Sequence, residues 1–223
     1  MKQLINLDQA CQTFNVDTGE LHTFTIRQWL SEALYRKLAL VMLGDAGLGK
    51  TPAAKSLLSV CARAEMAEDP FVLIASTVDV LRRASDCTGP GVPVLLDDWS
   101  PGKPRGNRRP STLEDIKHVL SVEVPLTVDA RNDDLVFYER QARICTANAR
   151  YISEWHEELP TMWASDTAME RRKYHPDIKA IFKRVCFCLA QQPLVDRSRA
   201  KRHGEDTAET SRVKVQRVLE EEA

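Results

Sequence analysis

Short apolar runs alternate along this chain with longer segments whose apolar residues recur three and four positions apart. Continuous apolar runs at Leu38–Leu43, Phe71–Ala75 and Val185–Leu189 predict buried strands, because a strand covered on both faces carries apolar side chains on both. Helical spacing after Thr25 and after Thr51 predicts amphipathic helices. Strands that alternate with helices are typical of an α/β fold with a mainly parallel central sheet between helices.

Shorter signals predict the remaining elements. Trp29 lies on the apolar stripe of the helix that Thr25 begins, so we interpret it as a core residue. Val124–Ala130 and Leu135–Tyr138 flank turn-type residues 131–134, which predicts a β-hairpin. Strands are also expected at Leu21–Thr25, Val92–Leu96 and Ala142–Asn148, and helices at Ser76–Ala84, at Asp177–Lys183 and from Ser111, where Glu114 completes a capping box.

The first apolar run ends in the segment Gly44–Thr51, whose sequence is GDAGLGKT. This segment, which we name the glycine loop, fits the phosphate-binding pattern G-x-x-x-x-G-K-[ST] at every fixed position. Glycines let backbone N–H groups point at phosphates, and the helix that follows presents its positive end. Lys50 is expected to reach the outer phosphates and the Thr51 hydroxyl to ligate Mg²⁺. The residues expected to bind nucleotide are Gly44, Asp45, Ala46, Gly47, Leu48, Gly49, Lys50 and Thr51.

Two acids and an amide follow later strands. Asp97 and Asp98 come directly after Val92–Leu96, and Asn148 ends another predicted strand. Asp97 is expected to hold Mg²⁺, directly or through water, and Asp98 to orient or polarise the attacking water. Asn148 is expected to hydrogen-bond the γ-phosphate and that water. The alternatives to these interpretations are a chance glycine-rich turn, an Asp-Asp turn and an Asn turn, each following a strand.

Composition narrows the class of protein. The chain has 223 residues, a formal net charge of −1 and six cysteines without zinc spacing, which indicates an intracellular protein with reduced core thiols. No apolar run is long enough to span a membrane, and the N-terminus lacks the apolar block of a signal peptide. We expect an N-terminal segment at 1–37, the main domain at 38–192 and a charged tail at 193–223, mobile or separately helical.

Positive charge is concentrated in two short segments of the chain. Residues 100–110 form a loop rich in glycine and proline with four cations and no acid. Its cations are Lys103, Arg105, Arg108 and Arg109. Such a loop either contacts a nucleic-acid backbone or is simply solvated, and both interpretations stay open. The basic cluster at 197–202 is read as a solvated tail, with a nuclear signal or nucleic-acid contact as the alternative.

Four sequence segments follow one another along the chain. They are the glycine loop, Leu95-Leu96-Asp97-Asp98-Trp99, the predicted hairpin at 128–138, and Thr146-Ala147-Asn148. Their order and spacing resemble the superfamily 3 helicase domain, most closely that of Rep initiators from circular single-stranded DNA viruses such as circoviruses. In that group the Walker B segment also ends in two Asp and an aromatic residue, and the sensor motif reads much like Thr-Ser-Asn. The resemblance covers about residues 38–190.

The resemblance implies an AAA+-like P-loop ATPase, with the hairpin before the sensor strand, acting as an ATP-driven helicase motor on single-stranded DNA in replication of a small circular replicon. ATP and Mg²⁺ would lie between the subunits of a ring, a hexamer in that family. Arg184 lies in a segment similar to the family's Tyr-Arg-Arg-Ile and would complete a neighbour's site, with Lys183 as the alternative. Arg131 falls where the family's DNA-contacting lysine lies. If the chain is viral, the host nucleus is expected.

The chain departs from that family in several places, among them the basic segment 100–110 after Trp99 and the arginine at position 131. Asn132 and Asp133 replace a glycine pair, which puts an acid beside the DNA contact. The family's N-terminal nicking endonuclease, with its His-hydrophobic-His motif, has no counterpart among the five isolated histidines. Two other hypotheses therefore stay open: an ATP-dependent oligomeric switch or assembly ATPase without helicase activity, and a superfamily 3 ATPase of the RNA-virus type.

Overall fold

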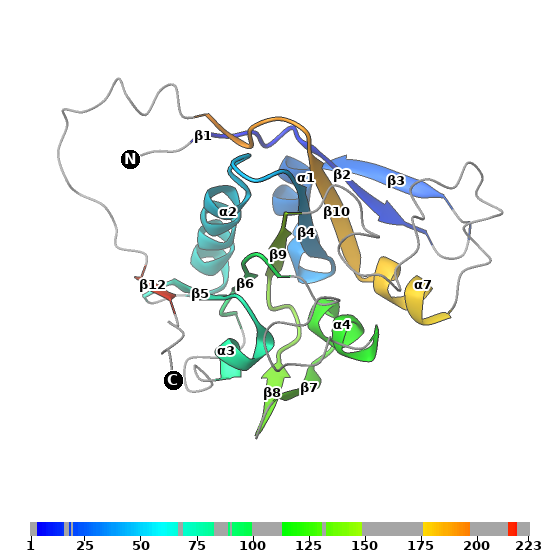
Figure 1. Ribbon diagram of the computed structural model, residues 1–223, viewed down its shortest axis with the longest axis vertical. Helices are drawn as coiled ribbons and strands as arrows, with labels where there is room; N and C mark the ends of the chain where they lie inside the picture. The colour runs from blue at the N-terminus through cyan, green and yellow to red at the C-terminus, as the bar shows by residue number, and fades with distance from the viewer. Residues whose placement is uncertain are drawn as a thin grey trace.

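Apart from those of the hairpin, the predicted strands come together in one central sheet, as the computed structural model shows (Figure 1). The structure describes residues 4–15, 18, 20–66, 69–82, 89, 91–99, 113–130, 133–148, 176–196 and 214–217. The fold is α/β, with a mainly parallel central sheet flanked by helices, and this much of the predicted fold class is confirmed.

The central sheet has a parallel part and an antiparallel extension. The parallel strands are β4 (Ala39–Gly44), β5 (Phe71–Ala75), β6 (Val94–Leu96), β9 (Arg143–Ala147), β10 (Val185–Ala190) and β12 (Lys214–Arg217), and the extension is β2 (Ala10–Phe14) with β3 (Leu21–Thr25). The strand order is β12-β5-β6-β9-β4-β10-β2-β3. The carboxyl ends of the parallel strands share one edge, which we call the C-terminal edge, and their amino ends share the N-terminal edge.

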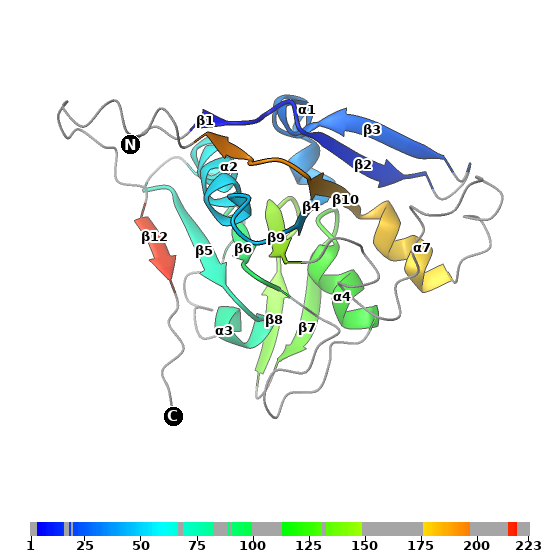
Figure 2. The ribbon, with the colours of Figure 1, turned by 45° about the horizontal axis from the view of Figure 1, so that its top comes forward.

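Helices cover both faces of the sheet. They are α1 (Ile26–Ser31), the 3₁₀ helix η1 (Leu34–Arg36), α2 (Lys50–Glu65), α3 (Val78–Arg82), α4 (Leu113–Leu120) and α7 (Pro176–Lys183). Side chains of a strand alternate between faces, so Leu40 and Met42 pack with α1 and α2, whereas Val41 and Leu43 pack with α3, α4 and α7. Figure 2 shows these two helix groups on opposite sides of the sheet.

The predicted β-hairpin is present as a separate two-stranded sheet, β7 (Leu126–Ala130) and β8 (Asp133–Phe137). Leu135 and Phe137 are buried in the cluster that contains α4. In the backbone register Asp129 lies opposite Asp134 near the end of the hairpin. The hairpin is therefore anchored to the core at one end and carries acidic residues at the other.

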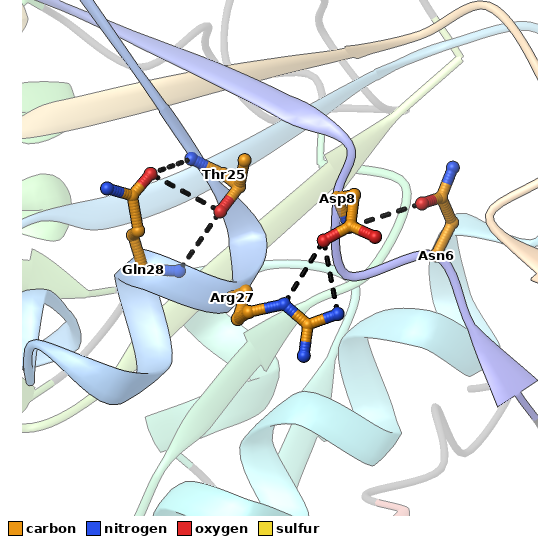
Figure 3. Close-up of polar contacts among 5 residues, drawn as sticks. All are labelled: Asn6, Asp8, Thr25, Arg27 and Gln28. Carbon is orange, nitrogen blue, oxygen red and sulfur yellow. Dashed lines mark hydrogen bonds and ion pairs between the residues drawn. The ribbon is translucent and has the colours of Figure 1, made fainter.

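Local capping explains where the first helix begins. Thr25 is the N-cap of α1: its Oγ1 accepts the Gln28 N–H at 3.2 Å, and Gln28 Oε1 accepts the Thr25 N–H at 2.9 Å (Figure 3). Arg27 adds an ion pair with Asp8 at 3.1 Å. The apolar stripe continues at helical spacing to Ala33 and Leu34 and so predicts a longer helix. The helix ends earlier because Ala33 has a φ of 52°, outside the helical region.

Other expectations are corrected or fall outside the description. The first 24 residues, for which the sequence indicates only a β-like stretch, supply β2, which pairs with β10, and β1 (Leu4–Ile5), which pairs with β11 (Val195–Asp196). In its described part the charged tail forms β12 beside β5, not a helix. The predicted helix start at Ser111 lies outside the described residues.

Within the described ranges, none of the helices combines the length and the apolar character that a membrane crossing requires. The thiols behave as the core groups that the sequence predicts. Cys11, Cys61, Cys145, Cys186 and Cys188 are buried and free, and Cys87 is outside the described residues.

Candidate nucleotide-binding site

Polar residues from three neighbouring strands meet at the C-terminal edge. The glycine loop follows β4, Asp97 and Asp98 follow β6, and Asn148 follows β9. Because β9 lies between β4 and β6, Asn148 falls between the glycine loop and the two acids. The sheet thus brings together side chains that are about 50 and 100 positions apart in the sequence.

Lys50 is the buried cation of this cluster, with an exposed fraction of 5%. Its ammonium donates to the carbonyl oxygens of Gly44 at 3.0 Å and Asp45 at 2.8 Å, and to Asn148 Oδ1 at 2.8 Å. Burial lowers the pKa of Lys50, and nearby carboxylates, Asp98 foremost, act in the opposite direction. All three N–H groups of the ammonium bond to neutral oxygens, and anionic phosphate oxygens are stronger acceptors for it.

Asp97 receives two hydroxyl groups on one carboxylate oxygen. Thr51 Oγ1 and Thr146 Oγ1 each donate to Asp97 Oδ1 at 2.7 Å. Oδ2 of Asp97 accepts no hydrogen bond from any residue that the structure describes. The two residues predicted to hold Mg²⁺, Thr51 and Asp97, are therefore in direct contact, and one carboxylate oxygen faces no protein donor among the described residues.

Asn148 links Lys50 to Asp98. Its Nδ2 donates to Asp98 Oδ1 at 3.0 Å, while its Oδ1 accepts from Lys50. The orientation of the amide follows from these partners, because an ammonium can only donate and an ionised carboxylate can only accept. Asp98 itself has a φ of 52°, and its backbone N–H donates to Thr146 Oγ1 at 3.0 Å. The site is thus a connected network of side chains.

The glycine loop needs its glycines for two different reasons. A Cβ on Gly44 would lie 2.5 Å from the Ala190 carbonyl oxygen, so the strand beside it leaves no space. Gly47 has a φ of 84°, and a Cβ there would meet no atom within 4 Å. The far side of the loop is held by the Leu194 N–H, which donates to the Leu48 carbonyl at 2.8 Å. Gly44 is therefore needed because the neighbouring strand leaves no room for a side chain, whereas Gly47 lies beside open space.

These residues fit the phosphates of a nucleotide with Mg²⁺. Helix α2 begins at Lys50 with Gly49 as its N-cap, which has no side chain to cap the first N–H groups of the helix. That end of a helix attracts anions. The Thr51 hydroxyl and the Asp97 carboxylate are hard oxygen ligands of the kind that Mg²⁺ prefers.

Arg184 lies away from this cluster, at the N-terminal edge. It precedes Val185, which pairs with Ala39 at the start of β4, whereas Gly44 is at the other end of that strand. At about 3.3 Å per residue the separation is roughly 20 Å. Its Nη1 donates to the Ala180 carbonyl at 2.6 Å, and the neighbouring Lys183 is exposed. Neither cation can act on the site of its own chain.

Thr146 is the site residue that sequence analysis does not single out beyond its place in the sensor motif. The signal that could have identified it is a polar residue inside a predicted strand that is otherwise suited to burial. In the structure Thr146 is completely buried. The predicted nucleic-acid residues Lys103, Arg105 and Arg131 lie outside the described residues.

No protein-family model and no curated protein matches the chain. Its function is therefore inferred from its own residues.

Proposed function

We propose that this chain is an AAA+-like P-loop ATPase that binds ATP with Mg²⁺ at the glycine loop and hydrolyses it. The observation that carries the proposal is the contact of Lys50 with Asn148 and of Thr51 with Asp97, at 2.8 Å and 2.7 Å, across three adjacent parallel strands. A phosphate-binding sequence could occur by chance in a loop. Its direct contact with an acid and an amide at the ends of two other strands supports a site that also performs chemistry.

Each residue has a distinct role in this proposal. Lys50 exchanges its carbonyl partners for phosphate oxygens, which suits a buried cation with neutral acceptors. Thr51 and Asp97 would hold Mg²⁺, which would neutralise negative charge on the phosphates. Asp98 orients the attacking water. Asn148 reaches the terminal phosphate by giving up its bond to Lys50 or to Asp98.

We propose that hydrolysis drives a superfamily 3-type helicase motor that translocates on single-stranded DNA as a homo-oligomeric ring. The position of Arg184 supports a ring, because a cation about 20 Å from its own glycine loop can complete only a neighbour's site. The hairpin β7–β8 projects from the core and is suited to line a pore. In this scheme one protomer's nucleotide is completed by the guanidinium of the next, and hydrolysis moves the hairpin.

One observation favours a second candidate, an oligomeric assembly ATPase without helicase activity. Asp129 lies opposite Asp134, and Asp133 opposite Ala130, next to the turn of the hairpin. Acidic residues at the end of a hairpin repel a phosphate backbone. An ATPase that uses nucleotide to set its oligomeric state would tolerate such a hairpin.

ATP hydrolysis by the purified chain tests the ATPase proposal. Lys50→Ala should lower the rate at saturating ATP at least about 100-fold, since it removes the cation closest to the phosphates. Lys55→Ala is the matched control, because Lys55 lies on the same helix without a contact to the site network. Hydrolysis at the normal rate in Lys50→Ala, or none in the unmodified chain, overturns the proposal.

Addition of single-stranded DNA separates the two candidates. A helicase motor should hydrolyse ATP several times faster with DNA at low salt, where phosphate contacts are strongest, and lose this stimulation as salt rises. An assembly ATPase should hydrolyse at a rate that depends on protein concentration and not on DNA. Analytical ultracentrifugation with and without a non-hydrolysable ATP analogue measures the number of protomers in the oligomer for either candidate.

A further inference from the structure

One buried hydroxyl connects both acids to the strand that carries Asn148. Thr146 Oγ1 donates to Asp97 Oδ1 at 2.7 Å and accepts the Asp98 N–H at 3.0 Å. The Thr146 carbonyl also accepts the Trp99 N–H at 2.8 Å. Thr146 thus contacts three consecutive residues at the end of β6, and it is completely buried.

These contacts explain how the turn after β6 keeps an uncommon shape. Asp98 has a φ of 52°, a left-handed conformation that costs a residue other than glycine roughly 1 kcal/mol. Its N–H points toward the sheet and needs an acceptor there, because an unpaired buried N–H costs more. The Thr146 hydroxyl meets that need and still has its own proton for Asp97. Among uncharged side chains of this size, only a hydroxyl is both a strong donor and a strong acceptor at one atom.

The same hydroxyl sets which oxygen of Asp97 is left for a metal. With Thr51 and Thr146 both donating to Oδ1, the carboxylate is held by two bonds to one oxygen and cannot easily rotate. Oδ2 then keeps a fixed direction. The Thr51 hydroxyl donates its proton to Oδ1, so its lone pairs point elsewhere and stay available to a cation.

We propose that Thr146 is a positioning residue of the Mg²⁺ site: its hydroxyl fixes the Asp97 carboxylate against Thr51 and holds the Asp98 turn, without itself ligating the metal. The inference rests on the proposed function and deepens it. Hydrogen-bond partners behind metal ligands typically contribute 10- to 100-fold to metal affinity. Because Asn148 lies two residues beyond Thr146, directly after the end of β9, this strand positions the sensor amide and the metal ligand together.

The test measures Mg²⁺ affinity directly. Binding of a fluorescent ATP analogue is titrated with Mg²⁺, and Mn²⁺ bound in the presence of ATP is counted by electron paramagnetic resonance. Thr146→Val, which keeps the shape and removes the hydroxyl, should raise the half-saturating Mg²⁺ concentration about tenfold or more. It should leave binding of the ATP analogue without metal unchanged. Thr146→Ser should restore the original value.

Thr13→Val is the matched control, because the Thr13 hydroxyl donates to the Val185 carbonyl at 3.0 Å in the same sheet, far from the site. It should leave Mg²⁺ affinity unchanged. If Thr146→Val fails to fold, Thr146→Cys replaces it, since a thiol is a weak donor and acceptor of similar size and should give an intermediate loss. Thermal unfolding confirms that each variant is folded.

The outcomes separate this inference from the proposed function. Unmodified protein that binds Mg²⁺ with ATP, together with unchanged affinity in Thr146→Val and in Thr146→Cys, overturns the positioning role and leaves the ATPase proposal in place. Equal loss of ATP analogue binding with and without Mg²⁺ assigns Thr146 a purely structural role and also overturns the inference. Unmodified protein that binds no ATP overturns both.

Discussion

The two edges of the parallel sheet use polar side chains in opposite ways. At the C-terminal edge, side chains bond to side chains on other strands, as Lys50 does to Asn148 and Thr51 to Asp97. At the N-terminal edge, Arg143 and Arg184 bond mainly to backbone carbonyls. The first kind of partner can be exchanged for a ligand, whereas the second belongs to the main chain of the fold.

Arg143 shows what the N-terminal edge does. It begins β9, has an exposed fraction of 1%, and donates to carbonyls of His118, Val119 and Ser121 at the end of α4. Its guanidinium also lies 4.5 Å from the Phe137 ring centre. A cation at the carboxyl end of a helix is favourable, so Arg143 ties α4 and the hairpin to the sheet. Burial lowers the pKa of Arg143 to about 9, so the group stays charged at neutral pH.

The comparison teaches that a buried cation is not by itself a sign of a binding site. Lys50 and Arg143 are both buried, and for both burial lowers the pKa. The two cations differ in their surroundings. Lys50 lies near the open space beside Gly47, whereas the end of a helix surrounds Arg143.

The largest effect is expected at the one N-terminal-edge residue to which we assign a catalytic role. Arg184→Ala should lower the rate of ATP hydrolysis by the oligomer about 1,000-fold, the usual contribution of an arginine that completes a neighbour's site. Nucleotide affinity of the isolated protomer should not change, because Arg184 is distant from its own glycine loop. Turnover and analogue binding are measured on the same samples. Lys183→Ala is the control, and if it carries the loss instead, the assignment belongs to Lys183.

Arg143→Met should lower the free energy of unfolding by about 3 kcal/mol, because several buried carbonyls lose their donor at about 1 kcal/mol each. Urea denaturation at constant m-value measures the change. Arg143→Lys should recover only part of it, since a single ammonium cannot replace a planar fork. Arg140→Met, at an exposed position, is the control. A fully stable Arg143→Met would show that the N-terminal edge does not depend on this guanidinium.

Two glycines of the glycine loop separate packing from ligand binding. Gly44→Ala should cost about 2 kcal/mol of stability, since its Cβ would collide with the Ala190 carbonyl. Gly47→Ala should cost about 1 kcal/mol for its left-handed backbone, yet weaken ATP binding about tenfold by filling the open space. Thermal unfolding and analogue titration give both numbers. The reverse pattern would place the phosphates elsewhere.

The smallest effect on stability is expected at the C-terminal end of α2, where Glu65 is the last residue of the helix. Tyr35 and Arg36 donate to Glu65 Oε1 at 2.8 Å and 2.7 Å. Burial acts to raise the pKa of Glu65, but these hydrogen bonds prevail and hold it below its usual value. A lowered carboxyl pKa stabilises the fold at pH values above the pKa of the unfolded chain, and that contribution is lost as pH falls through the folded value. Glu65→Gln should therefore cost about 1 kcal/mol at pH 7 and less at pH 3. An equal cost at both pH values would contradict this.

Much of the fold could be predicted because its signals are local. The apolar run Phe71–Ala75 became β5 with unchanged bounds, and Thr25 capped a helix through Gln28, three residues away. The glycine loop, Asp97, Asp98 and Asn148 could be named as candidates because each follows a strand in a motif of a few residues. The length of α1 was missed, since the left-handed backbone at Ala33 has no signal in the apolar spacing.

The sequence by itself determined the kinds of element and the candidate residues, because apolar periodicity, caps and short motifs act within a few positions of the chain. Tertiary structure alone decided that β9 lies between β4 and β6, and so that Thr146 contacts both acids and Asn148 contacts Lys50. It also placed Arg143 under α4 and Arg184 at the far edge. Strand order depends on which distant segments bury each other's faces, and that competition leaves no mark in local spacing.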